Sequence, residues 1–253
     1  MSTVETAVGR FVWHDHMSGD PAAASRFYGE LLGWEIEVWK PGEMDYPMIK
    51  VGDAQHGGFG PAQGGAPAHW LGHVAVDDAD EAAVRVEASG GSIVAPAMDI
   101  PEVGRMVVVA DPQGAILSLF RPADANWTPA EGVFVWDELM TTDVEGAKAF
   151  YGEVVGWESR DMDMGNGMTY TLFSSGGADR AGCMPLPPQA EGMPPAWLTY
   201  LGVEDVDATV EKAKSLGTSM VFMEPTDVMT VGRLAVIADA TGAAVGLFRP
   251  VES

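Results

Sequence analysis

The sequence predicts an α+β fold made of two tandem copies of one domain, and three observations support this prediction. "GRFVWHDHMSGDPAAASRFYGELLGW" near the N-terminus matches "GVFVWDELMTTDVEGAKAFYGEVVGW" 123 positions later. The ends of the copies also match, because "VGRMVVVADPQGAILSLFRP" and "VGRLAVIADATGAAVGLFRP" share 12 of 20 positions at an offset of 128. Within each copy, a strand–helix–strand–strand–strand pattern occurs twice, so the chain contains four such modules.

The first module begins with residues 11–17, whose aromatic and β-branched character predicts a strand. Asp20 is expected to cap a helix that starts at Pro21 and continues through "AAASRFYGELL". Gly33 is expected to end this helix in the left-handed conformation. Two strand-like stretches, "WEIEVW" and "YPMIKV", follow, and the glycines of "HGGFG" are interpreted as strand-edge glycines.

The second module repeats this order. "WLGHVAV" predicts a strand, residues 77–80 open the helix "EAAVRVEAS", and strands "SIVAPAM", "RMVVVAD" and "AILSLF" follow. The second copy has corresponding helices near 144–155 and 206–216. We therefore expect one domain over 1–122, a linker over 123–131 that is rich in proline and polar residues, and a second domain over 132–253.

The composition restricts the classes of function. The net charge of −23 would repel phosphate backbones and anionic lipids, which excludes nucleic-acid and membrane partners and favours solubility, salt adaptation or steering of cationic ligands. The N-terminus has no signal-peptide pattern, and no apolar run approaches the ~20 residues that span a bilayer. Cys183 is the one cysteine, so an internal disulfide is impossible. These features predict a cytoplasmic monomer or homodimer whose partner is a small molecule.

Three motifs carry a resemblance to a known family. They are "D-x-x-x-A-x-x-F-Y-x-x-x-x-G-W" in both copies, "GHVAVDDADEA" from Gly72, and "ADPQGA" from Ala110. The chain resembles the vicinal oxygen chelate superfamily, which includes glyoxalase I, bleomycin-resistance proteins and extradiol dioxygenases. It is most similar to a tandem-domain group labelled glyoxalase-like or hydroxylase. The resemblance implies that two modules pair into a half-open barrel, with metal ligands pointing inward from its strands.

The positions of these ligands can be followed in the present sequence. The first ligand position holds Trp13 and Trp136, neither of which can coordinate a metal. The other positions fall at His73 and Tyr200, at Ser118 and Gly246, and near His56 and Cys183. Zinc and non-haem iron sites need about three protein ligands. We therefore expect no metal cofactor, and the alternative is a divalent-metal site made by Asp15, His56 and His73.

Strand alternation assigns the side chains of "FVWHDHM" to two faces. If Trp13 faces the cavity, then Phe11, Asp15 and Met17 do so too, while both histidines face away. In the second copy Trp136, Glu138 and Met140 would face inward. A carboxylate in an apolar pocket can act as a general base or hold a polar group of a ligand, so Asp15 and Glu138 are the candidate catalytic residues. The alternative is that each forms a structural salt bridge, with Arg105 or Arg233 as its partner.

Further aromatic side chains complete the candidate ligand-binding surface. The candidate ligand-binding residues are Trp13, Met17, Tyr46, Trp70, His73 and Ser118 in the first copy, and Trp136, Met140, Tyr170, Trp197 and Tyr200 in the second. Ordinary core packing is the alternative for the aromatic residues and methionines. Three functions follow: metal-free binding of a small, largely apolar or aromatic molecule, a metal-dependent lyase, dioxygenase or hydroxylase that uses the first copy, or an interaction protein with vestigial cavities.

Overall fold

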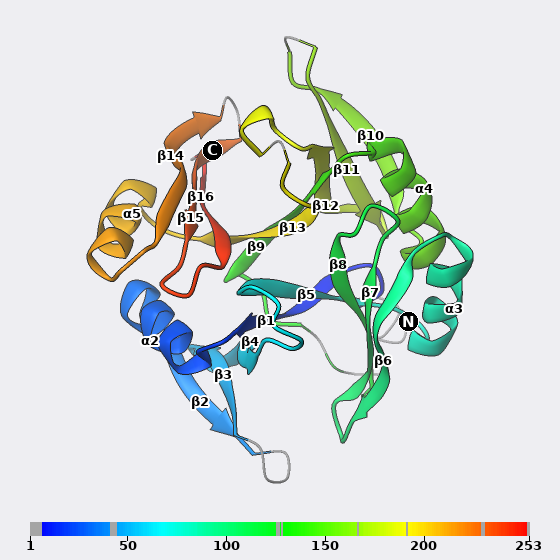
Figure 1. The fold of residues 1–253 in the computed structure, drawn as a ribbon, viewed down its shortest axis with the longest axis horizontal. Helices are drawn as coiled ribbons and strands as arrows, with labels where there is room; N and C mark the ends of the chain where they lie inside the picture. Colours follow the sequence, from blue (N-terminus) through cyan, green and yellow to red (C-terminus); the bar gives the residue numbers. More distant parts are fainter. Residues whose placement is uncertain are drawn as a thin grey trace. The chain divides into compact units, whose positions relative to one another are not determined.

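The computed structural model describes residues 7–40, 45–124, 127, 129–165, 167–190, 192–228 and 231–251. Each copy forms one open, mixed, eight-stranded sheet with two helices (Figure 1). The predicted fold class and the two modules in each copy are therefore confirmed. Residues 125, 126 and 128 of the expected linker lie outside the described residues, and the flanking strands end at Pro122 and begin at Phe134.

The first sheet has the strand order β2-β3-β4-β1-β5-β8-β7-β6. Its strands are β1 (Phe11–Ser18), β2 (Glu35–Trp39), β3 (Tyr46–Val51), β4 (Ala54–Pro61), β5 (His69–Ala75), β6 (Ser92–Ile100), β7 (Gly104–Ala110) and β8 (Ile116–Pro122). Helix α2 (Pro21–Leu32) follows β1, and helix α3 (Ala79–Ala88) follows β5. Strands β1 and β4 run parallel, as do β5 and β8, whereas the hairpins within each module are antiparallel.

The second sheet repeats this topology, with the order β10-β11-β12-β9-β13-β16-β15-β14. Its strands are β9 (Phe134–Thr141), β10 (Glu158–Asp163), β11 (Thr169–Ser175), β12 (Ala178–Pro185), β13 (Ala196–Gly202), β14 (Met220–Val228), β15 (Gly232–Ala238) and β16 (Ala244–Pro250). Its helices are α4 (Val144–Val155) and α5 (Val206–Ser215), and a short 3-10 helix covers Pro188–Ala190. Identical topology in both copies follows from the repeated motifs.

The helix boundaries agree with the capping residues of the sequence. The Asp20 carboxylate accepts a hydrogen bond of 2.9 Å from the backbone N–H of Ala23, and Gly33 ends α2 with φ at 73°. Asp143 and Gly156 cap α4 in the same way. Residue types that favour helix ends therefore set the length of the helix in the first module of each copy.

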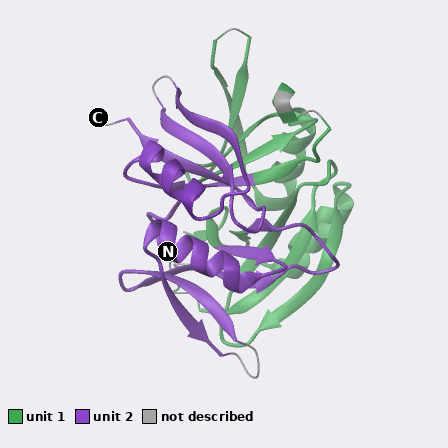
Figure 2. Cartoon of the chain, turned by 60° about the vertical axis from the view of Figure 1, so that its left-hand side comes forward, with its two compact units in different colours: residues 1–13, 72–129, 136–197 green, residues 14–71, 130–135, 198–253 purple. Residues whose placement is uncertain are grey.

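The chain divides into two compact units that do not coincide with the two copies (Figure 2). Unit 1 consists of residues 1–13, 72–129 and 136–197, and unit 2 of residues 14–71, 130–135 and 198–253. Each unit thus combines one module from each copy. Helices α3 and α4 pack together in unit 1, and α2 and α5 pack together in unit 2. The expected pairing of modules within a copy holds for the strand order, whereas the helices pack across copies.

In each unit, the helices and the strand faces that they cover form the core. The largest fully buried side chains in unit 1 are Tyr151, Phe173, Leu117, Leu119 and Leu139, and in unit 2 Tyr28, Phe59, Ile49, Leu201, Ile237, Leu247 and His16. Burial of each large apolar side chain contributes about 1.5–3 kcal/mol. Within the described part of the chain, the helices are too short or too polar to span a bilayer.

Candidate functional site

The first strand presents two different faces. Its residues alternate strictly, with Val12, His14, His16 and Ser18 buried and the side chains between them half-buried. The ring of His14 stacks on Phe134 at 4.1 Å, and His16 lies in the core of unit 2. The predicted alternation is thus confirmed for both histidines. We call the opposite side of each sheet the helix-free face. It carries Asp15 and Met17 in the first sheet and Glu138 and Met140 in the second.

Phe11 departs from the predicted alternation. Its ring packs against Trp157 and Trp197, with centroids 6.0 and 5.3 Å apart, in the core of unit 1. The prediction that Phe11 faces the cavity is wrong because this end of the strand belongs to unit 1, where its side chain enters the core. The side chains from Trp13 onward keep the expected spacing.

A tyrosine contacts the acid of the first copy. The hydroxyl group of Tyr46 on β3 donates a hydrogen bond to Oδ1 of Asp15 on β1. Strand β4 lies between them, and Gly58 on this strand pairs with Asp15. A Cβ atom on Gly58 would lie 2.1 Å from the Tyr46 hydroxyl, so glycine is required for the tyrosine to cross the strand.

The second copy contains the same arrangement with one more partner. Tyr170 donates to Oε2 of Glu138 over 2.8 Å, and Nε1 of Trp136 donates to the Tyr170 hydroxyl over 2.9 Å. A Cβ atom on Gly182 would lie 1.7 Å from that hydroxyl. Burial and the nearby charge of Glu138 raise the pKa of Tyr170, so the phenol stays protonated and acts as a donor.

The glycines of "HGGFG" therefore have a different role from the predicted one. Strand β4 lies in the interior of the sheet, with β3 and β1 as neighbours, so Gly58 is not an edge glycine. This role was not predicted, although a glycine recurs at the same place in both copies and pairs with the acid-bearing strand.

Arg105 and Arg233 are not the partners of the two acids, so the prediction of these two salt bridges is wrong. Arg105 binds Asp80 and Asp99, at 2.7 and 2.9 Å. Arg233 binds Asp207 and Asp227, at 2.5 and 2.9 Å. Hydrogen bonds from the arginines hold the pKa values of Asp80 and Asp207 below their usual range. Both arginines bind acidic residues on the helix and the hairpin of their own module.

Trp70 and Trp197 do not line the helix-free face. Both are buried, and the indole N–H of each donates a 3.0 Å hydrogen bond to a core tyrosine, Tyr28 for Trp70 and Tyr151 for Trp197. The prediction for these tryptophans is wrong because the alternation of the strand directs them toward the helices, together with Val74 and Leu201 respectively.

Other predicted side chains do lie on the helix-free face. The sulfur of Met17 lies 3.1 Å from the position of a Cβ on Gly60, so its side chain packs over β4. His56 shares the strand face of Gly58, and burial lowers its pKa, which keeps the imidazole neutral. Met140 has the same alternation and partial burial on β9.

Cys183 is not the counterpart of His56. Glu138 pairs with Gly182 as Asp15 pairs with Gly58, so Arg180 occupies the position of His56. Cys183 occupies the position of Phe59 and lies in the core of unit 1, where burial raises the pKa of its thiol to about 12. The expected alignment of Cys183 with a metal-ligand position is therefore wrong, because the strand register places its side chain on the core face of β12, opposite to the face of Arg180.

The donor set does not fit the metal of the superfamily. Tryptophan and glycine at the ligand positions cannot coordinate, and the N–H of Trp136 is already donated to Tyr170. Among the described residues, no three His, Cys, Asp or Glu side chains gather into a group that could hold a metal ion. Asp15 and His56 belong to unit 2, and His73 belongs to unit 1.

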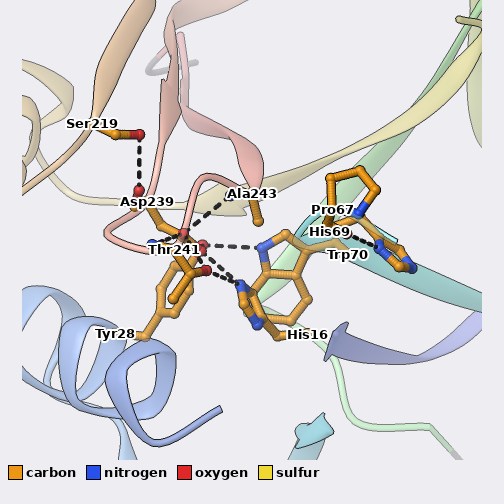
Figure 3. A network of polar contacts seen from close by, with 9 residues as sticks. All are labelled: His16, Tyr28, Pro67, His69, Trp70, Ser219, Asp239, Thr241 and Ala243. Carbon is orange, nitrogen blue, oxygen red and sulfur yellow. Dashed lines mark hydrogen bonds and ion pairs between the residues drawn. The ribbon is translucent and has the colours of Figure 1, made fainter. Parts of the chain in front are cut away.

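A buried polar network in unit 2 was not predicted (Figure 3). Nε2 of His16 lies 2.7 Å from Oδ2 of Asp239, and the Tyr28 hydroxyl donates to the same oxygen over 3.0 Å. The other carboxylate oxygen accepts from the backbone N–H groups of Thr241 and Ala243. The repeated "AD-x-x-GA" motif was a signal for this aspartate, but not for its distant partner.

Unit 1 contains the same network without the histidine. Tyr151 donates to Asp111 over 3.0 Å, while Leu139 stands at the position of His16. Burial raises the pKa of Asp111 above its usual value. Burial also acts to raise the pKa of Asp239, but the hydrogen bond and charge of His16 outweigh it and lower that pKa. The two aspartates therefore differ mainly because Asp239 has a buried histidine beside it, and also because the Thr241 hydroxyl group donates to it.

This difference predicts opposite dependences of stability on pH. A lowered folded-state pKa stabilises the protein above the unfolded-state value, and this contribution is lost as the pH falls through the folded value. A raised pKa has the reverse effect, so the cost of burying Asp111 is relieved on acidification. In chemical denaturation at several pH values, we expect the stability lost in Asp239→Asn to shrink on acidification. We expect Asp111→Asn to become less stable relative to the wild type as the pH falls. If the stability difference from the wild type changes with pH in the same way in both variants, the opposite pKa shifts of Asp111 and Asp239 are refuted.

The comparisons with known proteins agree with this fold. Residues 134–247 match the family model of the Glyoxalase/Bleomycin resistance protein/Dioxygenase superfamily, and residues 12–120 match that of the Glyoxalase-like domain. "Putative glyoxylase CFP32" of Mycobacterium tuberculosis is 35% identical over 247 residues, which cover 94% of each chain. "Anthracycline biosynthesis protein DnrV" of Streptomyces peucetius is 34% identical over 256 residues, covering 94% of this chain and 92% of that protein.

Solved structures show the same architecture. The Mn(II)-bound glyoxalase from Novosphingobium aromaticivorans has a TM-score of 0.64 at 17% identity. The match covers 97% of this chain and 83% of the glyoxalase chain. The 2,2',3-trihydroxybiphenyl 1,2-dioxygenase from Sphingomonas wittichii has a TM-score of 0.63 at 15% identity, with coverage of 95% and 90%. Four βαβββ modules in two sheets define a glyoxalase-type protein. This chain belongs to the Glyoxalase/Bleomycin resistance protein/Dioxygenase superfamily.

Proposed function

We propose that this protein binds a small, largely apolar or aromatic molecule on the helix-free face of one or both sheets, without the metal of the superfamily's enzymes. The observation that carries the proposal is the chain of hydrogen bonds from Trp136 through Tyr170 to Glu138, which begins at the position that the resemblance assigns to the first metal ligand. Its tyrosine–acid part recurs in the first copy as Tyr46 and Asp15. Each copy thus presents a carboxylate that a tyrosine hydroxyl group orients.

The chemistry of this surface favours a planar ligand with a polar substituent. Tryptophan, tyrosine and methionine side chains offer polarizable, apolar contact area, and a carboxylate accepts a hydrogen bond from a hydroxyl group. The name of the Streptomyces relative refers to anthracycline biosynthesis, which supports a polycyclic aromatic ligand. The carboxylate can also act as a general base on such a hydroxyl group, and this would turn the binding site into an enzyme site.

Fluorescence titration with a commercial anthracycline tests the proposal. We expect saturable quenching in the wild type, and a dissociation constant raised by about tenfold in Asp15→Asn if a charge-assisted hydrogen bond is weakened there. Glu138→Gln is the matched variant of the second copy. Absence of saturable binding in the wild type contradicts the proposal, and unchanged affinity in both variants contradicts the role of the carboxylates.

A divalent-metal enzyme that uses Asp15, His56 and His73 is the alternative, and the geometry does not favour it, because these side chains do not gather into a group that could hold a metal ion among the described residues. Two of the relatives and neighbours are named as glyoxylase or glyoxalase proteins. Stoichiometric metal in the purified protein, lost in His56→Ala, would support this candidate over the metal-free one.

A further inference from the structure

One strand pair on the helix-free face differs between the copies. In the first sheet, His73 on β5 pairs in register with Ser118 on β8. In the second sheet, Tyr200 on β13 pairs in register with Gly246 on β16. Leu117 and Leu119 lie in the core of unit 1, so Ser118 points to the opposite side of the sheet.

In the second copy, tyrosine fills this place. A Cβ atom on Gly246 would lie 2.1 Å from Cδ1 of Tyr200, so the ring rests directly on the glycine. No residue with a side chain fits under the ring in that position. Tyr200 is 6% exposed, and its ring replaces the polar group found in the first copy.

In the first copy, the same place holds a hydroxyl group without a partner. Ser118 is fully buried, and its Oγ atom makes no hydrogen bond. A buried hydroxyl in this state costs free energy that a hydrogen bond from a ligand or water would recover. His73 lies beside it, 3% exposed, and adds an imidazole that can donate or accept.

We propose that His73 and Ser118 form a polar notch in the first copy that binds a hydroxyl or carbonyl group of an aromatic ligand, and that Tyr200 closes the corresponding notch in the second copy. This inference rests on the proposed function. It assigns recognition of the polar group to the first copy and names aromatic molecules with a hydroxyl or carbonyl group as the class of ligand. Hydroxyquinones and phenols can form a hydrogen bond with Ser118 Oγ, whereas unsubstituted aromatic hydrocarbons leave this hydroxyl group without a partner. Such a site discriminates because buried polar groups that lack a partner weaken binding.

Reciprocal double variants of the full-length protein test the notch. The probes are 1,4-dihydroxyanthraquinone and anthracene, which share a three-ring plane but differ in hydrogen-bonding groups. His73→Tyr with Ser118→Gly gives the first copy the pair of the second, and Tyr200→His with Gly246→Ser does the reverse. We expect the closed variant to lose its preference for the hydroxylated probe, and the opened variant to gain a second site for it.

Ser118→Ala is the variant that separates binding from folding. Its Oγ atom has no partner, so the substitution is expected to leave thermal stability unchanged or slightly higher. It should weaken binding of the hydroxylated probe by about tenfold and leave anthracene affinity unchanged. Unchanged affinity of the hydroxylated probe in both Ser118→Ala and the closed variant would overturn the notch. If the wild type binds neither probe, the proposed function fails; if it binds both equally and the variants match it, only the notch fails.

Discussion

Replacing Asp239 by alanine is expected to lower the free energy of unfolding by about 3–5 kcal/mol, the range for removing one charged partner from a buried polar network. The substitution removes the 2.7 Å partner of His16 Nε2 in the core and the acceptor of the Tyr28 hydroxyl group. It also releases the backbone N–H groups of Thr241 and Ala243. Urea denaturation followed by far-UV circular dichroism measures the loss.

Asp111→Ala is the matched control in unit 1. It removes the same backbone contacts and the same tyrosine partner, but no histidine, because Leu139 occupies that position, and no threonine hydroxyl, because Gln113 stands where Thr241 donates to Asp239. Burial already raises the pKa of Asp111, so part of its favourable contact is offset by the cost of the buried charge. A clearly smaller loss is expected. Equal losses in the two variants would show that His16 and the Thr241 hydroxyl group add nothing to the network.

Gly182→Ala is expected to displace Tyr170 and cost about 1–3 kcal/mol, the usual range for overpacking. The new methyl group would lie 1.7 Å from the tyrosine hydroxyl and 2.3 Å from the ring carbon that carries it. Tyr170 must then leave both Trp136 and Glu138. Near-UV circular dichroism and thermal unfolding report the change around Trp136.

Gly60→Ala provides the comparison for this prediction. Its Cβ would lie 3.1 Å from the sulfur of Met17, at the end of a flexible side chain that can move away. A small effect is expected there. If Gly182→Ala is as well tolerated as Gly60→Ala, the tyrosine–acid pair is not held by the glycine strand.

Local patterns were sufficient to predict most of the fold. The caps Asp20 and Gly33 and the spacing of the repeats determine α2 and the strand order, because these features act within a module. The packing of modules across copies could not be read from the sequence, since both copies carry the same motifs and alternative pairings conserve the local pattern. His16 and Asp239 therefore come together without any sequence signal.

The candidate site was predicted in part. Alternation correctly assigned His14 and His16 to the helix side of β1, but Trp70 was assigned to the wrong side because its strand is buried on both faces and shows no polar alternation. The tyrosine partners of Asp15 and Glu138 lie on another hairpin, 31 and 32 residues away, and depend on Gly58 and Gly182. A contact that skips one strand has no periodic signature in the sequence.

The central claim is that a ligand is bound by tyrosine–acid pairs and aromatic side chains rather than by a metal. Anthracycline titration before and after treatment with a chelator tests it most directly. The account predicts the same dissociation constant in both titrations. Loss of binding after chelation, with recovery on addition of Mn²⁺, Zn²⁺ or Fe²⁺, would contradict it.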